Sequence, residues 1–73
     1  MLGLLINERE QDEMVYVLKR ELEEMLMDLD DHRIDQSVKK SMIKRYQVIF
    51  NLFQRVASEQ ECMQYMLKES YVK

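Results

Sequence analysis

Residues 42–67 decide the fold of this chain, and they read MIKRYQVIFNLFQRVASEQECMQYML. Apolar side chains recur here at steps of four and three residues, the spacing of one face of an α-helix. A second row, formed by Ile43, Phe50 and Ala57, runs beside the first and widens the apolar stripe. We therefore predict a second helix over about residues 36–68, whose seam is formed by Met42, Tyr46, Ile49, Phe53, Val56, Gln60, Met63 and Leu67.

A first helix is predicted over about residues 7–31. Asn7 is followed three residues later by Glu10, which is the pattern of a capping box at the beginning of a helix. The residues that follow are rich in glutamate, leucine, lysine and methionine, all of which favour helix formation. The steps of three and four recur, and the seam consists of Val15, Leu18, Leu22, Met25 and Leu29.

The two predicted helices are separated by the acidic stretch 28–35, with a turn at about residues 32–35 and Asp35 as the N-cap of the second helix. In an antiparallel pair, facing residues have numbers with a constant sum, and a sum of 71 aligns the two seams. The sequence therefore predicts an all-α antiparallel hairpin. Its expected layers pair Leu29 with Met42, Met25 with Tyr46, Leu22 with Ile49, Leu18 with Phe53, Val15 with Val56, Gln11 with Gln60, Glu8 with Met63 and Leu4 with Leu67.

The charge pattern agrees with this pairing. Residues 7–31 carry ten acids and three bases, whereas residues 32–57 carry one acid and six bases. An antiparallel hairpin brings the acidic end of the first helix beside the basic beginning of the second. The chain as a whole has a net charge of −3 and a pI near 5.1, which disfavours binding to nucleic acids or to anionic membranes. A weak nucleic-acid-associated regulator that uses Lys39, Lys40 and Lys44 is the alternative function.

Composition narrows the class of protein further. The 73 residues contain no proline and a single glycine, which disfavours β-hairpins, barrels and glycine-rich phosphate loops. Cys62 is the only cysteine, and no secretory signal is evident, so a cytoplasmic location is expected. The apolar run Met1–Ile6 is too short to span a membrane. Either the first helix begins near Leu2, or Asn7 caps it and residues 1–6 form an arm, and in both cases we expect burial of this run.

A single hairpin leaves too much apolar surface exposed. Met14, Val17 and Leu26 flank the first seam, and Val48, Leu52 and Met66 flank the second. Because a scaffold of this size rarely has a sufficient core, we expect self-association, most simply as a dimeric four-helix bundle. A higher oligomer, or another protein bound in a helical groove, is the alternative. The expected core and interface residues are Val15, Leu18, Leu22, Met25, Leu29, Met42, Tyr46, Ile49, Phe50, Leu52, Phe53, Val56, Met63, Met66 and Leu67.

Catalytic and metal-binding motifs receive little support. Asp28 and His32 are four residues apart and could share a helix face, but two such ligands need a second copy to complete a coordination shell. Cys62 lies 30 positions from the only histidine, so a buried or half-buried thiol is expected in place of a nucleophile. We therefore expect a non-enzymatic protein without a cofactor or metal, which acts through protein–protein contacts.

In size and helical pairing, the expected hairpin resembles the small sporulation-associated aspartyl-phosphate phosphatases, antiparallel helical pairs that dephosphorylate response regulators. That family carries Ser-Gln-Glu-Leu-Asp on its second helix, whereas the corresponding region here reads Ser41-Met42-Ile43-Lys44-Arg45-Tyr46. The resemblance is therefore architectural and assigns no functional residue.

Overall fold

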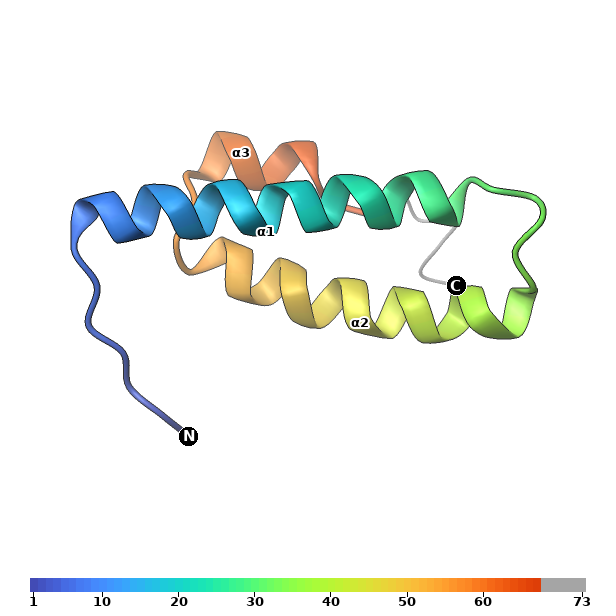
Figure 1. Cartoon of the computed structure of the whole chain (residues 1–73), viewed down its shortest axis with the longest axis horizontal. Coiled ribbons are helices and arrows are strands. Elements are labelled where there is room, and N and C mark those ends of the chain that lie inside the picture. The colour runs from blue at the N-terminus through green and yellow to red at the C-terminus, as the bar shows by residue number, and fades with distance from the viewer. Residues whose placement is uncertain (68–73) are drawn as a thin grey trace.

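The computed structural model describes residues 1–67 and is helical, with no strand within that range. Two long helices, α1 (Glu8–Leu29) and α2 (Gln36–Gln54), lie side by side and antiparallel, and a short helix, α3 (Glu59–Gln64), runs back along them (Figure 1). The all-helical class and the two long helices are as the periodicity predicts.

The beginning of α1 is set by a capping box. The Asn7 side chain accepts a hydrogen bond from the Glu10 backbone N–H at 2.8 Å, and the Glu10 carboxylate accepts one from the Asn7 N–H at 3.1 Å. These bonds satisfy backbone donors that a helix leaves unpaired at its first turn. The helix therefore begins at Glu8, and residues 1–6 form an extended arm.

The connection between α1 and α2 is a short acidic turn. The Arg33 guanidinium donates to both Asp31 carboxylate oxygens, at 3.1 and 3.0 Å, and this contact lowers the pKa of Asp31. The Asp35 carboxylate accepts a hydrogen bond from the Ser37 N–H at 3.0 Å, so Asp35 is the N-cap that the sequence predicts for α2.

The prediction of one continuous second helix over about 36–68 is wrong. Helix α2 ends at Gln54, residues 55–58 form a turn, and Ser58 begins α3 with a capping box that pairs it with Glu61. The apolar period continues in the sequence through this turn, but its members on α3, Gln60 and Met63, are exposed. Local capping chemistry, and not periodicity, ends α2. Residue 68, the predicted end of the helix, lies outside the described residues.

The turn also changes the expected layers at this end of the hairpin. Gln11 does not face Gln60, because its Nε2 donates to the Val56 carbonyl oxygen at 2.8 Å, just beyond the end of α2. Met63, expected opposite Glu8, is 68% exposed on α3. Leu67 lies beside Tyr46 and not beside Leu4. All three corrections follow from the reversal of the chain at residues 55–58.

The core lies where the three helices meet. Its buried cluster consists of Leu22 and Met25 from α1, Tyr46 and Phe53 from α2, and Tyr65 just after α3. Half-buried apolar side chains surround this cluster: Val15, Leu18, Leu26, Met42, Ile49, Phe50, Ala57, Cys62 and Leu67.

Candidate protein–protein interface

Tyr65 attaches the returning segment to one side of the hairpin. The Tyr46 hydroxyl donates to the Tyr65 carbonyl oxygen at 2.6 Å, and the Tyr65 hydroxyl donates to Glu23 Oε1 at 2.5 Å. The Tyr65 ring meets the Phe53 ring edge to face, with centroids 5.5 Å apart. This geometry is favourable for aromatic pairs, so both long helices hold the same residue.

Both tyrosines of this attachment remain protonated at neutral pH. Burial raises the pKa of Tyr46 to about 12. Burial also raises the pKa of Tyr65, and the hydrogen bond to the Glu23 carboxylate raises it further. Each hydroxyl therefore acts as a hydrogen-bond donor with no charge of its own.

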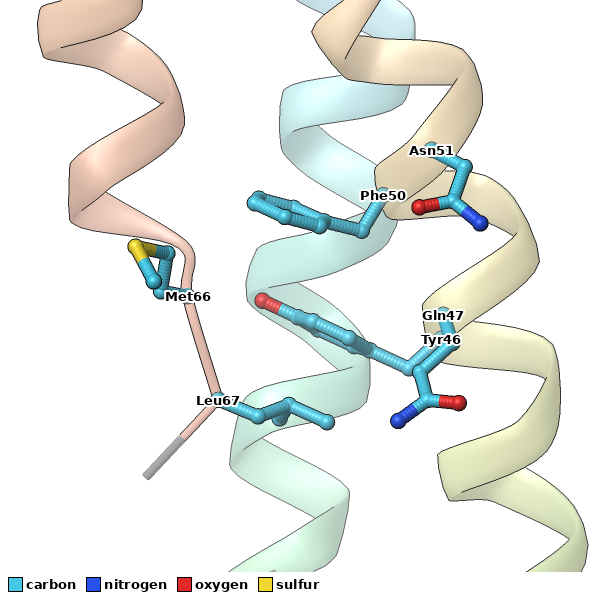
Figure 2. A pocket seen from close by; sticks show the side chains of 6 residues that line it. All are labelled: Tyr46, Gln47, Phe50, Asn51, Met66 and Leu67. Atoms are coloured by element: carbon cyan, nitrogen blue, oxygen red, sulfur yellow. The ribbon is translucent and has the colours of Figure 1, made fainter. Parts of the chain in front are cut away.

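A pocket of about 270 Å³ lies between α2 and the segment that follows α3. Figure 2 shows Tyr46 and Phe50 projecting from α2 toward Met66 and Leu67. Gln47 and Asn51 complete the lining among residues 1–67. The side chains of this lining accommodate an apolar group.

The two sides of the hairpin differ in what covers them. Glu21 and Glu23 stand on either side of buried Leu22, and successive side chains on a helix point about 100° apart. Glu23 binds Tyr65 on the α3 side, whereas Glu21 forms an ion pair with Arg45 at 2.8 Å. The Glu21 side of the hairpin is therefore the side that α3 leaves uncovered.

Apolar side chains from both long helices lie on this uncovered side. Val17 stands one helical turn before Glu21, and Val48 stands one turn after Arg45. Leu52 and Met14, one further turn along each helix, line one pocket together. Val17 is 59%, Val48 69% and Leu52 39% exposed, and Met14 is half-buried. We call Met14, Val17, Val48 and Leu52 the uncovered face.

The arm of residues 1–6 begins beside the uncovered face. Leu2, Leu4 and Ile6 border the pocket formed with Met14 and Leu52, which has a volume of about 250 Å³. Toward the N-terminus the arm runs past the end of α2 (Figure 1), and Leu2 and Leu4 still border this pocket. We expected this run to be buried, but the single chain does not bury it. Four of its side chains are each at least 75% exposed: Met1, Leu2, Leu4 and Leu5.

The basic cluster predicted at the beginning of α2 is partly neutralised. Arg45 pairs with Glu21, as the charge pattern predicts for an antiparallel hairpin, and Lys39 is half-buried. Lys40 and Lys44 are exposed on α2. Lys40 and Lys44 stand one helical turn apart on the same side of α2.

The other candidate groups stay apart. Within residues 1–67, no three histidine, cysteine or acidic side chains form a group that could hold a metal ion, Asp28 and His32 included. Cys62 is half-buried against the core cluster. No helix in the described range is long and apolar enough to cross a membrane.

The predicted core and interface residues fall into three groups. Leu22, Met25, Leu29, Tyr46 and Phe53 are buried, and Leu52, Met63 and Met66 are exposed. The rest are half-buried: Val15, Leu18, Met42, Ile49, Phe50, Val56 and Leu67.

Sequence reasoning missed Tyr65 and its partner Glu23. Tyr65 lies outside the seam series, so a continuous helix would point it away from the first helix. The signal that could have found it is the Ser-x-x-Glu pattern at residues 58–61, which marks a new helix beginning just before Tyr65.

Comparison with known proteins found no match: no protein-family description, no curated protein and no solved structure matches the chain.

Proposed function

We propose that this chain is a small helical interaction protein that associates with a second copy of itself through the uncovered face. The dimer has the four long helices at its centre, as two antiparallel hairpins packed face to face, with α3 on the outside of each copy. The observation that carries the proposal is the row of exposed apolar side chains on the side opposite α3, formed by Val17, Val48 and Leu52.

A second copy fits this face by its charge. The ion pairs Glu21–Arg45 and Arg20–Glu24 lie beside the apolar residues, with N–O distances of 2.8 and 3.9 Å. Since each pair is neutral within its own subunit, an identical face can approach without the repulsion that a single-sign surface would produce. Two-fold symmetry then lets the same patch serve both partners.

Size also favours a second copy. Within residues 1–67, the buried cluster of one chain consists of five side chains. Full burial of one exposed aliphatic side chain contributes about 1.5–3 kcal/mol, so two uncovered faces together add a core comparable with that of each subunit. The four side chains of the uncovered face are apolar, which supports action through protein contacts. The single cysteine supports a reducing, cytoplasmic location.

Light scattering after size exclusion tests this proposal on the full chain. The unmodified chain is expected to elute with twice its mass of 9.0 kDa at micromolar concentration. Val48→Glu introduces a charge at the centre of the uncovered face and should weaken the dimer at least tenfold. Met63→Glu, on the exposed side of α3, is the matched control and should leave the dimer intact. Equal dimerisation of both variants would contradict the proposal.

A further inference from the structure

The segment that returns along the hairpin, residues 58–67, is attached to it mainly through one residue. Tyr65 is its one buried side chain, with an exposed fraction of 6%, and none of the six residues of α3 is buried. Glu61, Cys62 and Leu67 are half-buried, and the other side chains of the segment are exposed. Because so little apolar surface holds it, this segment can open locally at a lower free energy than the two long helices.

Packing is incomplete at both ends of this segment. At its end, the pocket of about 270 Å³ is lined by Met66 from the segment and by Phe50 from α2. At its beginning, Glu61 shares a hollow of about 500 Å³ with Glu8 and Asp12 from the first turns of α1. Three carboxylates of the same sign oppose close contact between α3 and α1. The attachment of the segment therefore depends on the contacts that Tyr65 makes between these two hollows.

The surface beneath Tyr65 matches a tyrosine at three points. The Phe53 ring, which is fully buried, meets the Tyr65 ring edge to face. Glu23 Oε1 accepts the hydrogen bond from the Tyr65 hydroxyl, and the Tyr46 hydroxyl donates to the Tyr65 backbone carbonyl oxygen. We call Leu22, Glu23, Tyr46 and Phe53 the tyrosine site. Because the ring, hydroxyl and carbonyl that it contacts belong to one residue, the ligand that suits this site is a tyrosine within a peptide segment.

We propose that the returning segment is an exchangeable occupant of the tyrosine site. When the chain opens at residues 55–58, the site accepts a helical segment of another protein that ends in a tyrosine, held as Tyr65 is held here. The chain's own segment is tethered beside the site, so it competes with the partner. The partner's apparent affinity is therefore lowered by the fraction of chains that are open. The tyrosine site lies on the Glu23 side of the hairpin, opposite the uncovered face, so this inference does not depend on self-association.

Fluorescence anisotropy with a labelled peptide tests this exchange on the full chain. The probe has the sequence of residues 57–67 with Cys62→Ser, so it copies the chain's own occupant. Tyr65→Ala weakens the tethered occupant, and this variant should bind the probe about tenfold more tightly than the unmodified chain does. Met63→Ala, at an exposed position of α3, is the matched control and should bind the probe as weakly as the unmodified chain. Equal affinities of Tyr65→Ala and Met63→Ala for the probe would overturn the proposal.

A second comparison tests recognition of the hydroxyl. A probe that carries Tyr65→Phe keeps the ring and lacks the donor to Glu23, so the Tyr65→Ala chain should bind it about tenfold more weakly than the tyrosine probe. Adding Glu23→Ala to the Tyr65→Ala chain should remove this preference for tyrosine, because the acceptor is then absent. A preference that persists in the double variant would show that the probe binds elsewhere, and the assignment of the site would be wrong.

Hydrogen exchange of the unmodified chain tests the opening itself and does not require that Tyr65→Ala folds. Amides of residues 62–65 should be protected about a hundredfold less than those of residues 22–29, because the segment opens while the hairpin stays folded. The open fraction obtained from these amides should agree, within about tenfold, with the ratio of the probe's affinities for the unmodified and Tyr65→Ala chains. Equal protection of the two stretches would show that the segment opens only on global unfolding, which would overturn the exchange.

Discussion

At the scale of single residues, Tyr46 is the side chain on which the returning segment depends most. Its hydroxyl donates to the Tyr65 carbonyl oxygen from a buried position. Tyr46→Phe keeps the ring and removes the donor, which leaves that carbonyl without its partner. We expect a loss of about 1–3 kcal/mol in the free energy of unfolding, measured in urea. Tyr16→Phe, on an exposed part of α1, is the control and should change stability by less than about 0.5 kcal/mol. Equal stabilities of the two variants would show that the hydrogen bond from Tyr46 does not stabilise the returning segment.

The same side chain makes stability sensitive to alkaline pH. The pKa of Tyr46 is about 12 in the folded chain, against about 10 when unfolded, so the unfolded chain loses its proton first. The protonated Tyr46 side chain therefore contributes fully to the free energy of unfolding below pH 10. As the pH rises toward 12, roughly 1–3 kcal/mol of this free energy is lost. Urea midpoints at pH 8, 10 and 11 should fall more steeply for the unmodified chain than for Tyr46→Phe. Parallel curves would show that another group controls the alkaline transition.

At the scale of elements, the turn at residues 55–58 depends on the Ser58 cap. Ser58 Oγ accepts a hydrogen bond from the Glu61 N–H at 3.2 Å and donates to the Glu61 carboxylate at 3.0 Å. Ser58→Ala should cost about 0.5–2 kcal/mol in unfolding free energy and reduce the protection of α3 amides in hydrogen exchange. Ser41→Ala, within α2 and exposed, is the control. Full protection of residues 59–64 in Ser58→Ala would show that the cap does not determine where α3 begins.

Sequence reasoning predicted the elements whose boundaries have strong local signals and failed where two signals compete. Asp35 caps α2 as expected, and Asn7 caps α1, which is one of the two beginnings that the sequence leaves open. At Ser58 the apolar series continues while the capping pattern signals a break. A heptad count runs on through such a break, although here its members on α3, Gln60 and Met63, are exposed. The attachment at Tyr65 could not be predicted because it exists only after this reversal.

At the scale of the whole molecule, α3 makes the two sides of the hairpin unequal. The sequence places the apolar excess on two flanks, one formed by Met14, Val17 and Leu26 and the other by Val48, Leu52 and Met66. Because Tyr65 and α3 cover the Glu23 side, the exposed apolar side chains that the two long helices present together, Val17, Val48 and Leu52, lie on the side of Glu21 and Arg45. Two-fold pairing of this one face would give a closed dimer.

Sedimentation equilibrium of the unmodified chain over about 1–100 µM tests the central claim most directly. We expect one reversible monomer–dimer equilibrium, with a mass that approaches twice 9.0 kDa and does not rise beyond it. Val17→Glu, on the α1 half of the uncovered face, should shift the curve toward the monomer by at least tenfold in concentration. A constant mass of 9.0 kDa across the range, or a dimer that Val17→Glu leaves unchanged, would contradict association through this face.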